Sequence, residues 1–430
     1  MAEGVICRRG GSGGSGIPST MLEKVTAPAL ENITIGQAVE YRMYPGEDVF
    51  NYSSQANPAQ FLAASPDLSI LCFRGTSTST YRYLYIWRLI DGQYSLVQTI
   101  DSGLAANYME KAEVSSDNQF IVASYGDTNK TAFLWKHDGN SFVKTSAGMG
   151  CGSSGSYHTL MFTPNGGYLV IGRYDSALSI YKIDKATGTT TPCTVTGALT
   201  GSEGTSSYRL SCDLAANYIL HTFGTTGTST TTYRLQIFKR TGDTFAPVVS
   251  LSNSTVSYNA AISLTGKYVA TNKTSSMDFY TFQNDVLTLV TPSAGNWPTT
   301  TANHYAFSPD GKYLYAAPGT TPYILIMKID TSANTLQKLA NPTTLPTDWG
   351  YVYCSADSRQ ILYGRNTSAI LSIYTTGAGA YMLLLRNLCD ARYLALNQYT
   401  NYKLGIADAT VAAGQPCTAT MVKVLNEVIT

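Results

Sequence analysis

The residues best suited to acid-base chemistry in this chain are its four histidines, because an imidazole changes charge near neutral pH. They are His137, His158, His221 and His304, and each falls in a different part of the sequence. His158 and His304 both precede an alternating apolar segment, which would place them near one mouth of a ring-shaped fold. The alternative is that all four are turn or surface histidines with satisfied hydrogen bonds, and their scatter favours that interpretation.

Other catalytic patterns are missing from the sequence. It contains no G-x-S-x-G, H-E-x-x-H, phosphate-loop or dinucleotide-binding motif, and the early GGSGGSG lacks the following Lys that a phosphate cradle needs. Several carboxylates lie at turns, where Asp is a good turn former: Asp67, Asp117, Asp310 and Asp357. A pair of carboxylates from different repeats, as in glycoside hydrolysis, stays open. We therefore predict no catalytic residue, no cofactor and no enzymatic activity.

The cysteines do not form a metal-binding pattern. The eight are Cys7, Cys72, Cys151, Cys193, Cys212, Cys354, Cys389 and Cys417. None is part of a C-x-x-C pair, and none has a His at zinc spacing. We expect most of them to be reduced thiols in the core, and we predict no metal site.

Tyrosine is the most suggestive residue type for binding. The chain has 31 tyrosines, and many fall at the ends of apolar segments or between them. Rigid amphipathic rings on loops suit protein or carbohydrate recognition. The candidate binding residues are Tyr108, Tyr157, Tyr208, Tyr258, Tyr305 and Tyr351. The competing interpretation is that most tyrosines pack inside the fold.

Composition limits the partners of the chain. Of 430 residues only 13% are charged, and 29 basic side chains nearly cancel 28 acidic ones. Nucleic-acid binding needs local runs of Lys and Arg, which are missing here, so we expect no nucleic-acid partner. No apolar run is long enough to span a bilayer, and residues 1–16 lack the apolar stretch of a secretory signal. We expect a soluble product made in the cytoplasm without membrane insertion.

A repeat of about 48 residues organises the sequence. The string FSPDGKYLYAA is one of seven similar copies, aligned on Pro66, Ser116, Pro164, Leu214, Leu264, Pro309 and Ala356. Their spacings are 50, 48, 50, 50, 45 and 47 residues. Each copy reads as a strand, a turn and a second strand, followed by a third strand with a bulky residue and a fourth strand after another turn. The bulky residues in register are Trp87, Trp135, Tyr181, Phe238, Tyr280, Met327 and Tyr374.

Four short antiparallel strands per repeat form one propeller blade, so the sequence predicts an all-β, seven-bladed β-propeller. Two residues before each aligned position stands an apolar residue, which we expect to pack blade against blade. This column consists of Ala64, Val114, Phe162, Cys212, Ile262, Phe307 and Cys354. It gives Cys212 and Cys354 a structural role as core thiols.

The two ends of the chain do not match the repeat. Residues 31–49 alternate well enough for one or two strands, and residues 402–425 predict two strands around Ala413-Gly414. Neither end can bury a core alone, so we predict that they form one β module into which the propeller is inserted. The expected domains are a flexible arm (1–21), the first half of the module (22–51), the propeller (52–377) and the second half (378–430).

The terminal segments resemble small β modules of tailed-bacteriophage virion proteins, such as tail fibres and head-decoration proteins. The residues that fit this pattern are Gly405, Ile406, Ala407, Ala413, Gly414, Val422 and Val424. The repeats resemble lactonase-type and tryptophan-aspartate-type propellers, most clearly in FSPDGKYLYAA and YILIMKID. That second resemblance implies a fold and not an activity.

These resemblances imply a non-enzymatic structural protein of a virion that displays a propeller for surface attachment, as a tail fibre or receptor-binding element, or for capsid decoration. Its expected partners are other virion proteins, including further copies of itself, and a protein or glycan of the host surface. Two alternatives stay open: a soluble propeller enzyme, either a lactonase or a glycan-acting hydrolase or lyase, and a scaffold that binds partner proteins.

Overall fold

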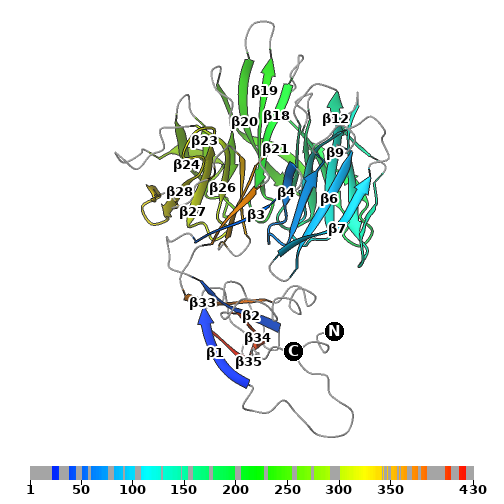
Figure 1. Cartoon of the computed structure of the whole chain (residues 1–430). Helices are drawn as coiled ribbons and strands as arrows, with labels where there is room; N and C mark the ends of the chain where they lie inside the picture. Colours follow the sequence, from blue (N-terminus) through cyan, green and yellow to red (C-terminus); the bar gives the residue numbers. More distant parts are fainter. Residues whose placement is uncertain are drawn as a thin grey trace. The chain divides into compact units, whose positions relative to one another are not determined.

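The computed structural model confirms an all-β chain with a seven-bladed propeller (Figure 1). Every regular element among the residues described below is a β-strand. The structure describes residues 22–28, 38–44, 51–56, 60–75, 82–90, 93–101, 108–126, 129–146, 148–153, 158–173, 178–198, 205–226, 231–253, 259–272, 276–290, 301–340, 342, 346, 350–355, 358, 360–365, 370–375, 379–384, 402–407 and 416–422.

Six blades are built from strands that follow one another in the sequence and pair mostly antiparallel. Blade 1 comprises β4 (Gln60–Ala64), β5 (Ile70–Arg74), β6 (Tyr83–Ile90) and β7 (Gln93–Asp101). Blade 2 comprises β8 (Tyr108–Val114), β9 (Phe120–Gly126), β10 (Asn129–His137) and β11 (Phe142–Lys144), with β12 (Met149–Ser153) also paired to β10. Blade 3 comprises β13 (Thr159–Phe162), β14 (Tyr168–Gly172), β15 (Leu178–Ile183) and β16 (Thr190–Pro192).

The next three blades repeat this order. Blade 4 comprises β18 (Thr205–Cys212), β19 (Tyr218–Thr226), β20 (Thr231–Thr241) and β21 (Thr244–Asn253), with the short β17 (Thr194–Val195) parallel to β21. Blade 5 comprises β22 (Ala260–Ile262), β23 (Tyr268–Asn272), β24 (Met277–Gln283) and β25 (Val286–Leu289). Blade 6 comprises β26 (Ala302–Phe307), β27 (Tyr313–Pro318), β28 (Leu325–Asp330) and β29 (Thr335–Lys338).

Blade 7 is the exception, because both ends of the propeller sequence contribute to it. Its strands β30 (Gly350–Cys354), β31 (Gln360–Arg365) and β32 (Ile370–Thr375) are completed by β3 (Asn51–Ala56) at the outer edge. The pairing of β3 with β32 closes the ring across the seam between the last and the first blade. Closure of this kind removes an open sheet edge, although the sequence had not predicted the exchange of this strand.

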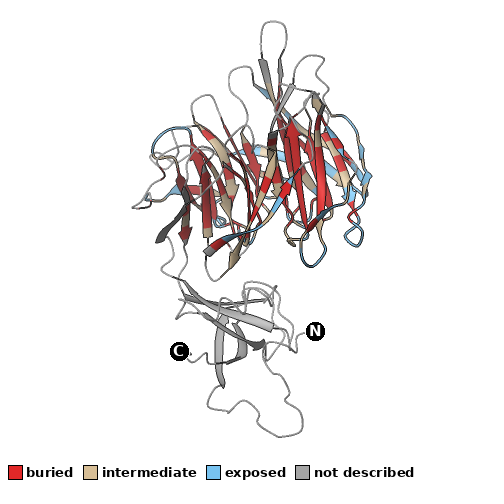
Figure 2. Cartoon of the chain, turned by 45° about the vertical axis from the view of Figure 1, so that its right-hand side comes forward, coloured by how far each residue is buried: buried red, intermediate tan, exposed pale blue. Residues whose placement is uncertain are grey.

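The second strand of each blade forms the middle of the core (Figure 2). Strands β9, β14, β23 and β27 are buried at every residue, including the polar Ser124 of β9 and Thr271 and Asn272 of β23. The predicted inter-blade column is buried at Ala64, Val114, Phe162, Cys212, Ile262 and Phe307, whereas Cys354 is half-buried. Cys72, Cys151 and Cys212 are buried free thiols, as expected for core cysteines.

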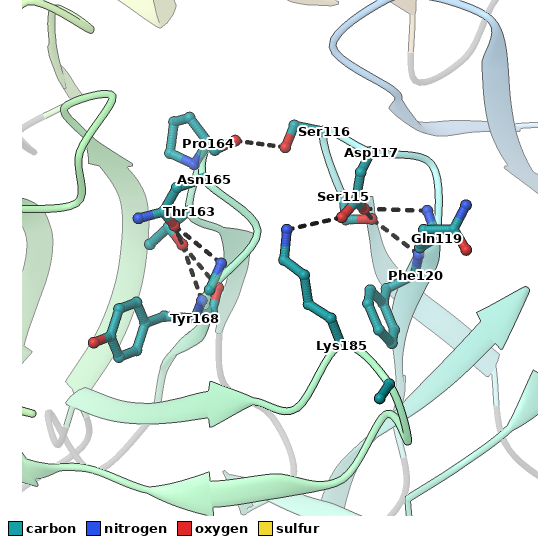
Figure 3. A network of polar contacts seen from close by, with 12 residues as sticks. Ser115, Ser116, Asp117, Gln119, Phe120, Thr163, Pro164, Asn165, Tyr168 and Lys185 are labelled. Carbon is teal, nitrogen blue, oxygen red and sulfur yellow. Dashed lines mark hydrogen bonds and ion pairs between the residues drawn. The ribbon is translucent and has the colours of Figure 1, made fainter. Parts of the chain in front are cut away.

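The turn between the first and second strands carries a recurring polar network, which Figure 3 shows for blades 2 and 3. In blade 2 the Ser115 hydroxyl donates to Asp117 at 2.7 Å and accepts the Phe120 N–H at 2.9 Å. In blade 4, Asp213 replaces the serine and accepts the Tyr218 N–H directly at 2.6 Å. The degenerate repeats therefore keep the turn by exchanging one hydrogen-bond acceptor for another.

These turns are also bonded to each other around the ring. Asn118 donates to Asp67 of blade 1 at 2.7 Å, Ser116 donates to the Pro164 carbonyl of blade 3, and Leu214 donates its N–H to the Leu264 carbonyl of blade 5 at 2.8 Å. Lys185 of blade 3 adds an ion pair to Asp117 at 3.0 Å (Figure 3). Hydrogen bonds and an ion pair thus connect neighbouring blades on one face of the propeller.

A second sheet joins the two ends of the chain. It runs in the order β1 (Leu22–Pro28), β35 (Pro416–Val422), β34 (Tyr402–Ala407), β2 (Ala38–Tyr44) and β33 (Gly379–Leu384), with all pairs antiparallel. Strands of the two ends are interleaved in this order, with the C-terminal pair β35-β34 between the N-terminal strands β1 and β2, so neither end forms the sheet without the other. The predicted domain boundaries stay predictions, and the predicted arm, residues 1–21, lies outside the described residues.

Candidate functional site

The innermost strands of the blades alternate between residues packed among the blades and residues that face the centre of the ring. In β8, Ala112 and Val114 are buried, while Lys111 and Glu113 between them are only half-buried. Consecutive inner strands contact one another around the ring, from β4 through β8, β13, β18, β22 and β26 to β30. Because successive side chains of a strand point to opposite sides, the half-buried set lines the central channel.

Four blades send polar side chains into this channel. Lys111 and Glu113 come from β8, Arg209 from β18, His304 from β26, and Tyr351 and Tyr353 from β30. The Lys111 Nζ lies 5.8 Å and the Arg209 Cζ 5.3 Å from the centre of the Tyr351 ring. Blades 2, 4 and 7 are not neighbours in the ring, so these side chains meet across the channel. We call Lys111, Glu113, Arg209, His304, Tyr351 and Tyr353 the channel cluster.

The two cations control the acidity of the tyrosine between them. Lys111, and then Arg209, hold the pKa of the Tyr351 phenol below its usual value, through their charges and through hydrogen bonds to it. The Arg209 guanidinium is itself fixed by a 2.6 Å hydrogen bond from Nη2 to the Asn303 carbonyl. Tyr351 can therefore release its proton more easily than an ordinary tyrosine, which makes it the most activated phenol in the channel cluster.

The carboxyl group of the channel cluster behaves in the opposite way. Burial raises the pKa of Glu113 to about 8, although the charges of Lys111 and Arg209 work against this shift. At neutral pH the protonated acid is the favoured form, so the cluster carries an excess of positive charge.

His304 stays neutral in this environment. Burial, followed by the charge of Arg209, lowers its pKa well below the usual value. Its Nδ1 accepts the Val352 N–H at 3.3 Å, which leaves the imidazole proton on Nε2. The ring packs edge-on to Tyr351, with 5.6 Å between centroids, and lies 5.9 Å from Tyr353. The sequence favoured a surface or turn position for His304 and left the channel mouth as the alternative; the structure places His304 inside strand β26, on the channel side.

His158 lies elsewhere, in a network between blades 2 and 3. Its Nε2 lies 2.5 Å from the Ser124 hydroxyl, and its Nδ1 lies 3.2 Å from a Glu110 carboxylate oxygen. A serine, a histidine and an acid in this order resemble the arrangement of a hydrolytic triad. However, Ser124 has no exposed surface and His158 is only 1% exposed.

The contacts of Lys130 favour a structural role for this network over a catalytic one. Its ammonium group donates to both Glu110 oxygens at 2.7 Å and is 5% exposed. A buried ammonium group needs a carboxylate partner, and here Glu110 provides it. His158, the residue before β13, ties blade 3 to this ion pair in blade 2. The network fixes one blade against the next.

The six predicted binding tyrosines have different outcomes. Tyr351 lies in the channel cluster. Tyr305 is not a loop residue but part of β26; it is 4% exposed, and its hydroxyl donates to Asn272 at 2.8 Å inside the core. Strand alternation explains this correction, because Tyr305 follows the channel-facing His304 and so points between the blades. Tyr108 and Tyr208 lie in strands β8 and β18, but their side chains, and the whole of Tyr157 and Tyr258, lie outside the described residues.

Lys111 and Arg209 were missed from the sequence. Both stand three residues before the apolar inter-blade column, at Val114 and Cys212, and His304 and Tyr351 share this position before Phe307 and Cys354. Reading that position across all repeats would have gathered the four residues. The signal is partly hidden because β8 and β18 each contain a β-bulge just before it.

The described part of the chain has neither a metal-binding group nor a membrane-spanning helix. No group of three or more His, Cys, Asp or Glu side chains there could hold a metal ion. The same residues include no helix of the length and apolar character that crossing a membrane requires.

Comparisons with known proteins bear on the fold. No protein-family model and no curated protein matches the sequence. A chain of the hydrazine synthase of Kuenenia stuttgartiensis is similar in structure, with a TM-score of 0.54 and 13% identity over 76% of this chain and 97% of the other. A chain of the mitotic checkpoint complex is similar with a TM-score of 0.52 and 15% identity, over 82% of this chain and 98% of the other. At such low identity these similarities support the seven-bladed propeller fold and nothing finer.

Proposed function

We propose that this chain is a non-enzymatic structural protein of a tailed-phage virion that anchors itself through its terminal sheet and displays the propeller. Its role is surface attachment, as a tail fibre or receptor-binding element, or decoration of the capsid. The observation that carries the proposal is the sheet β1-β35-β34-β2-β33, in which strands from the two ends of the chain are interleaved. The propeller is thereby inserted into a second element.

Strand positions support the resemblance to phage modules. Gly405, Ile406 and Ala407 lie in β34, which pairs with β35, and Val422 ends β35 opposite Leu404. Ala413, Gly414 and Val424 lie outside the described residues. A sheet that contains both ends of an insertion holds the inserted domain at two covalent points, which suits a displayed domain.

Purified particles provide the test. Tailed particles from a culture that produces this chain should contain it at a fixed copy number, measured by quantitative mass spectrometry. Removing residues 379–430, which include β33, β34 and β35, should abolish incorporation because the terminal sheet is then incomplete. Arg209→Gln changes only the channel and should be incorporated normally. Absence of the full chain from the particles rejects the proposal, and gold labelling of head or tail separates decoration from attachment.

A hydrolytic enzyme is the second candidate, because Ser124, His158 and Glu110 are arranged like a triad. Its weakness is the complete burial of the Ser124 hydroxyl, which a substrate carbonyl has to reach. A fluorophosphonate probe should leave Ser124 unlabelled in the folded chain. Labelling that disappears in Ser124→Ala would favour the enzyme instead.

A further inference from the structure

We propose that the central channel binds a small carboxylate anion between Lys111 and Arg209, with Tyr351 as the third contact. The inference concerns a ligand site and does not depend on the virion role proposed above. It rests on the three side chains that meet across the channel from blades 2, 4 and 7.

The charges of the channel cluster favour an anion. Lys111 and Arg209 bring two positive charges to one phenol ring. The carboxyl that faces them, Glu113, favours its protonated form at neutral pH. His304 is neutral, and the phenol of Tyr353 is held neutral because burial raises its pKa. A bound monoanion would offset part of this positive charge.

The donors are positioned before any ligand arrives. Arg209 is anchored by the Asn303 carbonyl at 2.6 Å, so its guanidinium loses little freedom on binding. His304 presents its Nε2–H, because its Nδ1 accepts the Val352 N–H. Lys111, Arg209, His304 and Tyr351 are each only half-buried, so all four keep surface that a small ligand can reach.

The geometry points to a carboxylate. A planar guanidinium matches the two oxygens of a carboxylate, and the Lys111 ammonium adds a point charge beside it. At neutral pH the favoured protonated form of Glu113 can add a hydrogen-bond donor for a carboxylate oxygen beside the planar fork of Arg209. The ligand class is therefore a monocarboxylate, or one carboxylate group of a larger molecule.

Calorimetry with the full chain tests the site. Sodium acetate is titrated at pH 7 and constant ionic strength, with sodium chloride, phosphate and sulfate as comparison anions. We expect saturable binding of one acetate per chain. Arg209→Gln and Lys111→Gln should each weaken it at least about tenfold, because each removes a charge-assisted hydrogen bond. Lys338→Gln, which removes an exposed positive charge on β29, should bind like the parent.

A spectroscopic titration provides a second readout. Acetate should compete with the Tyr351 phenolate for the two cations, so it should shift the phenolate absorbance of Tyr351 to higher pH. Tyr351→Phe identifies that contribution by difference and keeps the ring. Circular dichroism confirms that each variant is folded; should Arg209→Gln unfold, Lys111→Gln and the titration still decide.

Three results would overturn the site: no saturable acetate binding, equal binding by both charge variants and the parent, or tighter binding of phosphate or sulfate than of acetate. Failure of acetate binding would leave the presence of the chain in virions unaffected, so the two proposals are separable.

Discussion

At the scale of single residues, the channel cluster shows how a ring changes the acidity of groups that are ordinary in sequence. The pKa values of Glu113 and Tyr351 both depend on the charges of Lys111 and Arg209, and Arg209 lies far from both of them in the chain. Closure of the ring brings these charges together and takes them out of bulk water. Both effects are invisible in the local sequence.

Glu113 predicts a measurable dependence of stability on pH. Its pKa is about 8 in the folded chain against a reference value of 4.5, so between these values the folded state binds a proton that the unfolded state lacks. Stability should fall as pH rises through this window, by at most about 1.4 kcal/mol per pH unit from this group. Glu113→Gln mimics the protonated acid and should match the parent near pH 4.5 but exceed its free energy of unfolding at pH 8, in urea titrations.

Asp138 is the control for this measurement. The N–H groups of Ser141 and Asn140, each 2.9 Å from its carboxylate, lower its pKa. The parent therefore gains stability from Asp138 only as pH rises from the lowered folded pKa to the reference value of 3.8, so Asp138→Asn removes this gain and leaves the slope between pH 4.5 and 8 unchanged. A Glu113→Gln variant whose stability parallels the parent at every pH would contradict the assignment.

At the scale of elements, the turn between the first two strands is the unit that the repeat retains. Its essential part is a buried acceptor that takes the N–H at the start of the second strand. In blade 6, Ser308 accepts the Tyr313 N–H at 2.8 Å and donates to Asp310 at 2.6 Å. The recurring Pro, Asp and Gly of the sequence mark this turn and not a catalytic element.

Ser308→Ala should lower the free energy of unfolding by about 1–3 kcal/mol, because the buried Tyr313 N–H loses an acceptor. Ser332→Ala removes a similar 2.6 Å bond, to Asp330, from an exposed turn of the same blade. It should change stability by less than about 0.5 kcal/mol. Denaturant titration measures the free energy of unfolding of both variants. Equal losses would show that burial does not decide how much the hydrogen bond in the turn contributes to stability.

At the scale of the whole molecule, closure depends on the packing of blade 7 against blade 1. A Cβ at Gly364 of β31 would lie 2.2 Å from a ring carbon of Phe61 in β4. Phe61 fills the seam, with its ring 5.6 Å from that of Phe73 and 5.5 Å from that of Tyr353. Only glycine allows this approach.

Gly364→Ala should destabilise the propeller by about 1–3 kcal/mol or more, because the methyl group overpacks the seam. Gly150→Ala in β12 is the control, since its added Cβ meets nothing within 4 Å. The double variant Gly364→Ala with Phe61→Leu should recover part of the loss, which thermal unfolding can detect as non-additivity. If the stability losses of the two single variants simply add, the added methyl group at position 364 does not collide with Phe61.

The sequence predicts the propeller because its signal recurs seven times and each copy obeys local turn chemistry. Strands β34 and β35 were predicted from a different signal, two apolar segments on either side of the Ala413-Gly414 turn. The channel cluster was not predicted as a site: Tyr351 was proposed as a loop residue and His304 was given a channel position only as the less favoured alternative, because a channel is formed by residues of non-adjacent blades. The pairing of β3 with β32 of blade 7 could not be predicted either. The two strands lie more than 300 residues apart, and no local pattern in residues 51–56 indicates which strand they pair with.

The placement of β3 has a consequence for synthesis on the ribosome. This strand emerges before any blade exists, whereas its partner β32 is the last strand of the propeller to emerge. A nascent chain therefore carries an unpaired strand through nearly the whole of translation, and a prematurely terminated product never buries it. Such fragments expose the unpaired strand β3 and the open edge of the last blade to other nascent chains. We therefore expect incomplete chains to aggregate more readily than the full-length chain.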